Sequence, residues 1–162
     1  VGSHRHFWPL FWDTVVTLHG QIGYVYKTTD ESIPIDEKFF LGGLRSIRGF
    51  DTRKVGPKEP DLNDAGEIVG YTYIGGEKSA FFNLEYLFPI SKSMGVKGVM
   101  FFDVGNAWLD EEEYFQKMRY SVGAGIRWFS PLGPLRFEWG YNLDPQEDEK
   151  RTVFEFSIGT VF

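Results

Sequence analysis

The chain has 162 residues, a length that suits one architectural unit. Aromatic residues make up 18% of the chain and charged residues 25%, alongside 19 glycines, a mixture that is unusual for a soluble core. The net charge of −6 argues against a nucleic-acid partner, and the lack of cysteine excludes disulfides, thiolate metal sites and cysteine nucleophiles.

Alternation of apolar and polar side chains predicts strands along most of the chain. The first is expected to end at residues 5–8, just before Pro9. Six further strands are expected at residues 16–27, 81–88, 100–108, 119–128, 135–142 and 153–162. Most approach the roughly 9–11 residues that a tilted membrane strand requires, so the pattern favours an all-β, antiparallel transmembrane barrel.

The two faces of these strands differ in a way that suits a membrane. One face carries glycines and charged groups, which fit a water-filled lumen: Arg127, Arg136, Glu138 and Glu155. The other face is apolar, and we expect its terminal aromatic residues to form interfacial belts: Tyr24, Tyr26, Trp108, Trp128 and Tyr141. A soluble ligand-binding barrel, with its apolar face turned inward, remains an alternative.

Short and long connections alternate along the chain. Residues 89–95 and 131–133 form short turns, whereas residues 28–78, 110–117 and 143–151 form longer polar loops. Membrane barrels have short turns on the periplasmic side and long loops outside. This pattern places the C-terminal Phe162 on the periplasmic side and makes residues 1–162 a single barrel segment with one long loop.

Six or seven strands are too few to close a membrane barrel. Unpaired backbone groups in hydrocarbon cost several kcal/mol each, so the edges must be paired. The segment is therefore expected to be the C-terminal part of a larger barrel, or to associate with another copy through its open strand edges.

The longest loop holds a basic segment flanked by glycine, residues 42–50 (GGLRSIRGF). Arginine forms bidentate bonds to carboxylates, and Glu85 and Asp103 share the polar face of neighbouring predicted strands. The hypothesis is that the loop folds into the lumen and Arg48 docks onto both carboxylates. On pattern alone, a solvated arginine in an exposed loop is the simpler alternative.

The same segment resembles the loop signature of BamA-type outer-membrane protein assembly factors. Residues 101–105 (FFDVG) and 130–135 (SPLGPL) resemble further motifs of that family, in the same order, so the resemblance spans residues 7–162. It implies a sixteen-stranded barrel preceded by periplasmic POTRA domains, with accessory lipoproteins as partners. It also implies a lumenal latch formed by Gly43, Arg48, Gly49, Phe50, Glu85 and Asp103.

The last strand resembles the C-terminal recognition signal of outer-membrane proteins, with alternate apolar residues at Phe154, Phe156, Ile158 and Phe162. Gly159 weakens the strand locally, and in relatives a glycine near this point lets the strand kink inward and open a seam. An incoming strand would satisfy the exposed backbone groups by β-augmentation.

These features predict a factor that inserts unfolded outer-membrane proteins into the lipid bilayer of a Gram-negative outer membrane. A transporter of the two-partner secretion type is the first alternative and the soluble barrel the second. We expect no enzyme, because the three histidines lack zinc-site spacing and no serine has a recognisable base. No catalytic residue, metal, cofactor or nucleic-acid partner is expected.

Overall fold

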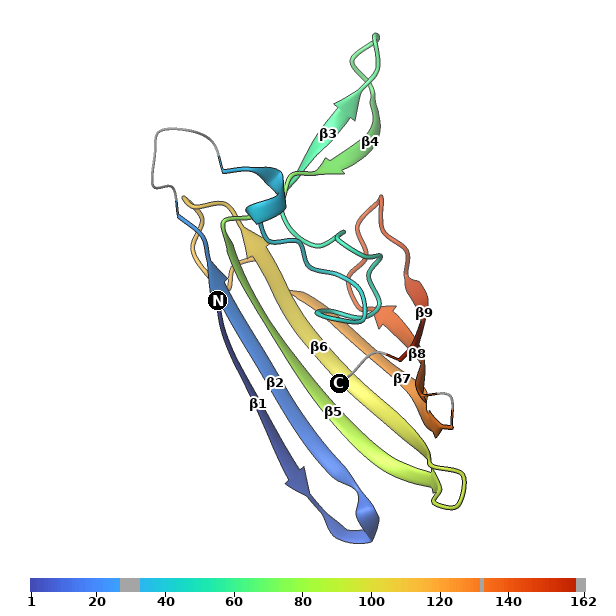
Figure 1. Ribbon diagram of the computed structural model, residues 1–162. Helices are drawn as coiled ribbons and strands as arrows, with labels where there is room; N and C mark the ends of the chain where they lie inside the picture. The colour runs from blue at the N-terminus through green and yellow to red at the C-terminus, as the bar shows by residue number, and fades with distance from the viewer. Residues whose placement is uncertain (27–32, 132, 160–162) are drawn as a thin grey trace.

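The computed structural model describes residues 1–26, 33–131 and 133–159. They form one curved antiparallel sheet of seven strands (Figure 1). In spatial order these are β1 (Gly2–Pro9), β2 (Val15–Tyr24), β5 (Lys78–Ser91), β6 (Val96–Trp108), β7 (Arg119–Ser130), β8 (Gly133–Asn142) and β9 (Thr152–Ile158). All seven predicted strands are therefore confirmed, and the spatial order follows the chain order.

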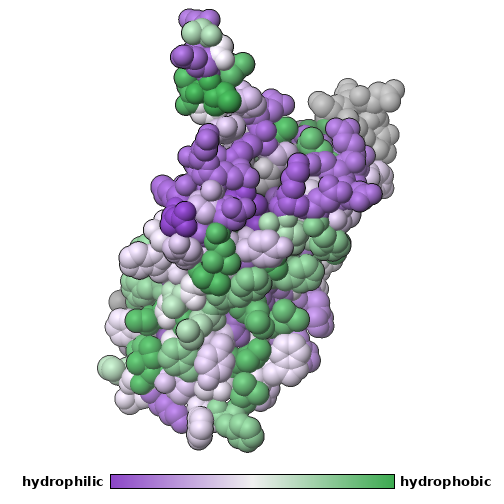
Figure 2. Space-filling model, turned by 180° about the vertical axis from the view of Figure 1, so that it is seen from behind, coloured by the Kyte–Doolittle hydropathy of each residue, from purple (hydrophilic) through white to green (hydrophobic). Residues whose placement is uncertain are grey.

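The two faces of the sheet have opposite characters, as the alternation predicts. Along β6, Met100 and Phe102 are 56% and 38% exposed on the convex face, whereas Asp103 is 0% exposed on the concave face. Apolar side chains spread over the convex face, with polar ones gathered at the loop end (Figure 2). An apolar surface of this extent marks a membrane or protein contact, and it argues against the soluble barrel.

The connections divide between the two ends of the sheet. At one end lie the short links: the 3-10 turn η1 (Phe11–Asp13), residues 92–95 and the link from β7 to β8. The long loops gather at the opposite end (Figure 1). Among the described residues, no helix is long and apolar enough to cross a membrane.

The described part of the longest loop, residues 33–77, packs against the concave face apart from a hairpin at residues 58–73. It contains the 3-10 turn η2 (Ile35–Glu37) and isolated bridges that join Phe39 to Gly76 and Leu41 to Val55. Its apolar side chains meet those of β5 and β6 in one buried cluster: Leu41, Ile47, Phe50, Val55, Phe81 and Ala107. The core therefore lies between the loop and the sheet.

One aromatic prediction is wrong. Trp108 was expected in the interfacial belt, but it is only 1% exposed. Its ring lies edge-on to Tyr114 with centroids 5.5 Å apart, and its Nε1 donates to the Gln116 carbonyl at 2.7 Å. The loop that follows β6 folds back over this tryptophan, which strand alternation could not indicate.

A two-stranded hairpin projects from the long loop: β3 (Lys58–Leu62) and β4 (Ile68–Tyr73) (Figure 1). Its base is joined to the loop between β8 and β9. The Tyr73 hydroxyl donates to Asp148 Oδ2 at 2.8 Å, and Lys58 Nζ forms an ion pair with Oδ1. The hairpin is thus linked to the segment that leads into the last strand.

This link should depend on pH. Burial alone would raise the pKa of Asp148, but the hydrogen bonds from Lys58 and Tyr73 hold that pKa below its ordinary value. Such a group stabilises the folded contact above its ordinary pKa of about 3.9, and the contribution is lost as the pH falls through the folded value. We expect the hairpin to separate from the loop below about pH 4.

Spin labels at Glu59→Cys and Glu147→Cys would report the separation, since the chain has no other cysteine. The distance distribution should broaden on acidification and should already be broad at neutral pH in Asp148→Asn. Asp144→Asn is the matched control. Asp144 forms its hydrogen bonds to Arg119 and Asn142 through its backbone carbonyl and N–H, so the loss of its side-chain charge should leave them in place. A distribution that stays narrow down to pH 2 would contradict the prediction.

Candidate functional site

The long loop makes a tight turn before Arg48. The Gly43 N–H donates to the Ile47 carbonyl at 3.0 Å, and the Ser46 N–H donates to the Gly43 carbonyl at 3.1 Å. Asn83 of β5 donates through Nδ2 to the Ser46 carbonyl at 2.6 Å. The turn is thereby fastened to the sheet with Arg48 facing the strands.

The residue after Arg48 allows the loop to lie directly on β8. Gly49 has φ +86°, a conformation that side-chain-bearing residues rarely adopt. A Cβ atom there would lie 3.1 Å from the Gly140 carbonyl carbon and from the Ser121 side chain. Glycine is therefore required both for the backbone turn and for the close approach.

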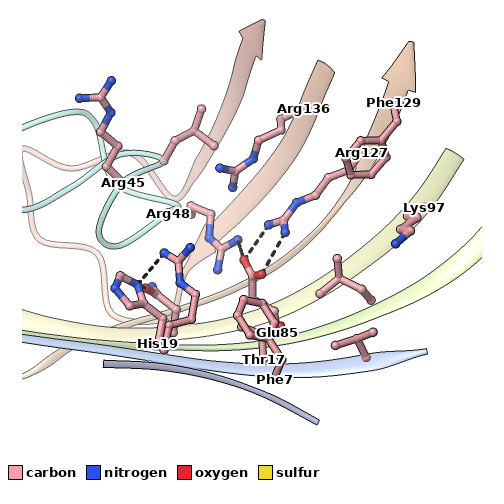
Figure 3. Close-up of a pocket in the computed structure, with 15 residues that line it drawn as sticks. Phe7, Thr17, His19, Arg45, Arg48, Glu85, Lys97, Arg127, Phe129 and Arg136 are labelled. Atoms are coloured by element: carbon pink, nitrogen blue, oxygen red, sulfur yellow. Dashed lines mark hydrogen bonds and ion pairs between the residues drawn. The ribbon is translucent and has the colours of Figure 1, made fainter. Parts of the chain in front are cut away.

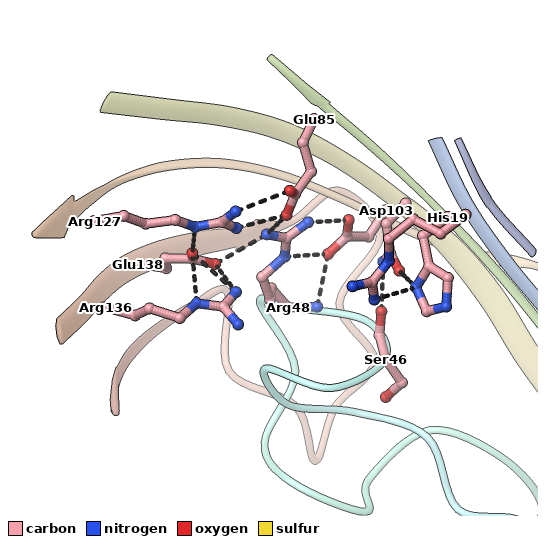
Figure 4. Close-up of polar contacts among 10 residues, drawn as sticks. His19, Ser46, Arg48, Glu85, Asp103, Arg127, Arg136 and Glu138 are labelled. Carbon is pink, nitrogen blue, oxygen red and sulfur yellow. Dashed lines mark hydrogen bonds and ion pairs between the residues drawn. The ribbon is translucent and has the colours of Figure 1, made fainter. Parts of the chain in front are cut away.

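Arg48 contacts the two carboxylates that the sequence singles out (Figure 4). Its Nε donates to Asp103 Oδ2 at 2.7 Å, and its Nη2 donates to Oδ1 at 2.6 Å, a bidentate pair. Its Nη1 donates to Glu85 Oε1 at 2.5 Å. The guanidinium also stacks on Phe101, 3.7 Å from the ring centroid.

A third carboxylate, Glu138 of β8, completes the cluster and was not among the predicted partners. Its Oε2 accepts from Arg48 Nη1 at 2.9 Å, and its Oε1 accepts from Arg127 Nε at 2.8 Å and Arg136 Nε at 3.0 Å. Arg127 also bonds both oxygens of Glu85. The polar-face parity of Arg127 and Glu138 was visible in the sequence, but their meeting with Arg48 depends on the loop's path.

The cluster is largely buried and balanced in charge, and one side of it borders the space on the concave face. Three arginines face three carboxylates, and the side chains of Asp103 and Glu138 are 0% exposed. Burial alone would lower the pKa of Arg48, but the bond to Asp103 and the nearby carboxylates hold it above its ordinary value. A buried ion cluster of this kind is costly to break, because the remaining charges would be buried without partners.

The other predicted latch residues lie around this cluster. Phe50 is 2% exposed in the core beneath the loop, with the Arg119 guanidinium 5.4 Å from its ring centroid. Gly43 has φ +92° and lies beside Glu155 of β9, whose Oε1 would be 3.3 Å from a Cβ at that glycine. All six predicted latch residues thus lie in one region of the concave face.

The last strand is short and paired on one side only within the described residues. β9 has seven residues, all bonded to β8, and Phe154, Phe156 and Ile158 are exposed on the convex face. Gly159 follows with φ +69°, and its N–H donates to the Pro134 carbonyl at 2.8 Å. Phe162 lies outside the described residues.

Two like charges face each other across β8 and β9. Glu155 is the register partner of Glu138, and its Oε2 is buried without a hydrogen-bond partner among the described residues. Its carboxylate accepts a hydrogen bond from the Leu44 backbone. The long loop therefore reaches the last strand as well as β5, β6 and β8.

Neutralising this charge should strengthen the last strand. Glu155→Gln keeps an acceptor for Leu44 but removes the repulsion from Glu138, a gain of about 0.2–1 kcal/mol. Hydrogen exchange of the β9 amides should slow accordingly, whereas Glu147→Gln in the preceding loop should leave it unchanged. Faster exchange in Glu155→Gln would show that the carboxylate stabilises β9.

Among the described residues, no group of three or more His, Asp or Glu side chains could hold a metal ion. The site consists of ion pairs and a strand edge.

Comparison with known proteins places this arrangement in a family. The Omp85 superfamily domain matches residues 1–162, the whole chain. The chain belongs to the Omp85 superfamily. It is 36% identical over 151 residues to the outer membrane protein assembly factor BamA of Nitratidesulfovibrio vulgaris, covering 90% of this chain and 18% of that protein. It is 31% identical over 192 residues to BamA of Neisseria meningitidis, covering 99% and 23%.

A solved structure shares this Omp85 fold. The crystal structure of BamA from Haemophilus ducreyi lacking POTRA domains 1–3 superposes with a TM-score of 0.79 at 22% identity, covering 95% of this chain and 33% of that one. The fold is thus that of an antiparallel transmembrane β-barrel. The chain spans about a fifth of the length of the BamA relatives, so its strands correspond to one part of a larger barrel.

Proposed function

We propose that this chain forms part of the barrel of an outer-membrane protein assembly and insertion factor. The observation that carries the proposal is in the last strand: Glu155 of β9 faces Glu138 of β8 as its register partner, so that a like charge opposes the pairing of β9. The named BamA relatives support the same function and do not favour a secretion transporter.

The mechanism follows from the physics of strand edges. Backbone N–H and C=O groups left unpaired in hydrocarbon cost several kcal/mol each, so a free edge of β9 attracts any strand that can pair with it. An unfolded client gains those hydrogen bonds and buries its own apolar face in lipid. The seam then acts as a template, and no covalent or nucleotide chemistry is needed.

The Arg48 cluster would keep this seam in register. Arg48 joins the loop to β5, β6 and β8 through Glu85, Asp103 and Glu138, and Leu44 joins it to Glu155 of β9. Because Glu138 of β8 is held by Arg48 of the loop and Arg127 of β7, movement is left mainly to β9. The latch would therefore fix one side of the seam and allow the other to open.

The proposed function also implies a cellular location and a set of binding partners. The chain lies in the outer membrane of a Gram-negative bacterium with its convex face in the lipid bilayer and the end of β9 on the periplasmic side. Its partners are unfolded outer-membrane proteins, POTRA domains and the accessory lipoproteins of an assembly complex. The open edges of the isolated segment would also allow self-association.

Disulfide trapping tests the templating step. A single cysteine at Ser157→Cys in β9 should cross-link to a cysteine in the terminal strand of a client during assembly by the full-length protein. Ser121→Cys in β7 is the matched control, because it lies on the same face of a strand that is paired on both sides. Equal cross-linking at both positions, or none at β9 while clients assemble, would refute templating at this edge.

A further inference from the structure

A cavity of about 470 Å³ lies on the concave face between the Arg48 loop and the short connections (Figure 3). Side chains from six strands and the loop line it. Six of them are cationic: Arg5, Arg45, Arg48, Lys97, Arg127 and Arg136. Glu85 is the only carboxylate among the described lining residues. This wall is strongly basic in a chain whose net charge is −6.

The carboxylates that pair with the lining arginines balance only part of the positive charge of this cavity. Glu85, Asp103 and Glu138 offset Arg48, Arg127 and Arg136, as described above. Even with Glu155 of the neighbouring wall included, six cations face four carboxylates.

The remaining cations, Arg5, Arg45 and Lys97, form no ion pair with a carboxylate among the described residues, although Asp13 lies near enough to Lys97 to be influenced by its charge. Arg5 Nη2 lies 3.4 Å from His19 Nδ1, and Lys97 Nζ lies 5.5 Å from the Phe129 ring centroid. Neither contact neutralises a charge. Arg45 is exposed at the loop side of the cavity. Three cations therefore have no ion-pair partner among the described residues, and the wall keeps an excess of at least two positive charges to attract an anionic ligand.

Apolar side chains also line this cavity, between the cationic ones. Its uncharged lining includes five apolar side chains: Phe7, Val15, Leu44, Leu87 and Phe129. A ligand that fits must combine anionic groups with apolar ones at short spacing. A lipid does not fit this description, because its acyl chains belong on the convex face while the cavity opens on the concave one.

We propose that this cavity binds an acidic, partly apolar segment of an extended polypeptide. Alternating carboxylate and apolar side chains would meet the cations and the apolar lining in turn. In identifying the ligand as a client polypeptide, the proposal rests on the proposed assembly function. It adds to that function a preference for acidic segments, held near the latch before they reach the seam.

Peptide binding to the full-length protein in detergent micelles tests the proposal. The probe is a dye-labelled decapeptide of alternating Glu and Val, compared by fluorescence anisotropy with one of alternating Gln and Val. The Glu peptide should bind at least tenfold more tightly, and its affinity should fall as salt is added. Arg45→Glu combined with Lys97→Glu should weaken its binding at least tenfold, and the neutral Gln pair should weaken it less.

Lys54→Glu is the control variant, because Lys54 lies exposed on the same loop and does not line the cavity. It should bind the peptide like the original protein, and unchanged heat-modifiable mobility would show that all variants fold. Equal binding of both peptides, or full binding by the charge-reversed variant, would overturn the proposal. So would phosphatidylglycerol binding that depends on Arg45 and Lys97 when the peptide does not bind.

The two proposals can fail separately. Peptide binding needs no assembly activity, so a cavity that binds while β9 fails to cross-link would refute templating alone. Cross-linking at β9 without charge-dependent peptide binding would refute the cavity alone.

Discussion

Replacing Arg48 by alanine should destabilise the protein by about 3–5 kcal/mol, the largest effect expected of any single change. The substitution leaves Asp103, Glu138 and Glu85 without their shared cation, and the first two are fully buried. Asp103 would lose its only ion pair among the described residues while it stays buried, whereas Glu85 and Glu138 would keep Arg127 and so lose only part of their stabilisation. Urea unfolding in lipid vesicles would measure the loss, and protease cleavage would show the loop leaving the concave face.

Arg53→Ala is the matched control, because Arg53 belongs to the same loop but is exposed, with its guanidinium 4.1 Å from the Phe40 ring centroid. It should change stability by less than about 1 kcal/mol. Arg48→Lys should recover only part of the loss, because an ammonium cannot form the bidentate bond to Asp103 while also reaching Glu138.

A double-mutant cycle would identify the pair. Arg48→Ala and Asp103→Ala should be strongly non-additive, since each removes the partner of the other. If Arg48→Ala behaved like Arg53→Ala, the cluster would not hold the loop.

Gly140→Ala should detach the loop from β8, with a loss of about 1–3 kcal/mol or more. A Cβ at this position would overlap the backbone nitrogen and Cα of Gly49, and neither is the end of a flexible side chain that could move away. The backbone that carries Arg48 would have to shift, so the ion cluster would be strained as well. Urea unfolding would measure the loss, and protease cleavage of residues 42–50 would report the detachment.

Gly70→Ala is the control, because Gly70 is also a strand glycine and its added Cβ would meet only Asp61 Oδ2 at 3.5 Å. That variant should unfold like the original protein. If Gly140→Ala did so too, the loop would not lie as tightly on β8 as the structure places it.

The strands were predictable because a membrane sheet presents one face to lipid and the other to a polar space. Each strand of the main sheet shows that difference as a two-residue period, so the order and facing of its seven strands could be predicted without any tertiary information. The strands β3 and β4 were missed, because they lie within the span that was expected to be a loop. Trp108 shows where this reasoning fails. Its position in the alternation favours lipid, but a following loop covers it, and no local pattern encodes that cover.

The contacts of the candidate site also fall into those that the sequence could predict and those that depend on the tertiary structure. Glu85 and Asp103 could be proposed for Arg48 because neighbouring strands with equal parity bring them to one face. Glu138 could not, because its contact with Arg48 depends on the path of residues 33–77 across the concave face. That path is set by the apolar contacts of Ile47 and Phe50 and by the approach of Gly49 to Gly140, all of them long-range.

By itself, then, the sequence determined an alternating, membrane-facing sheet and a basic loop that requires glycine. The tertiary structure alone decided which carboxylates share Arg48, that β8 is held while β9 carries an opposed charge, and that the residual cations line one cavity. The physical reason is that periodicity is a property of one strand, whereas charge balance belongs to residues up to 90 positions apart in the chain. Only folding brings such groups within bonding distance.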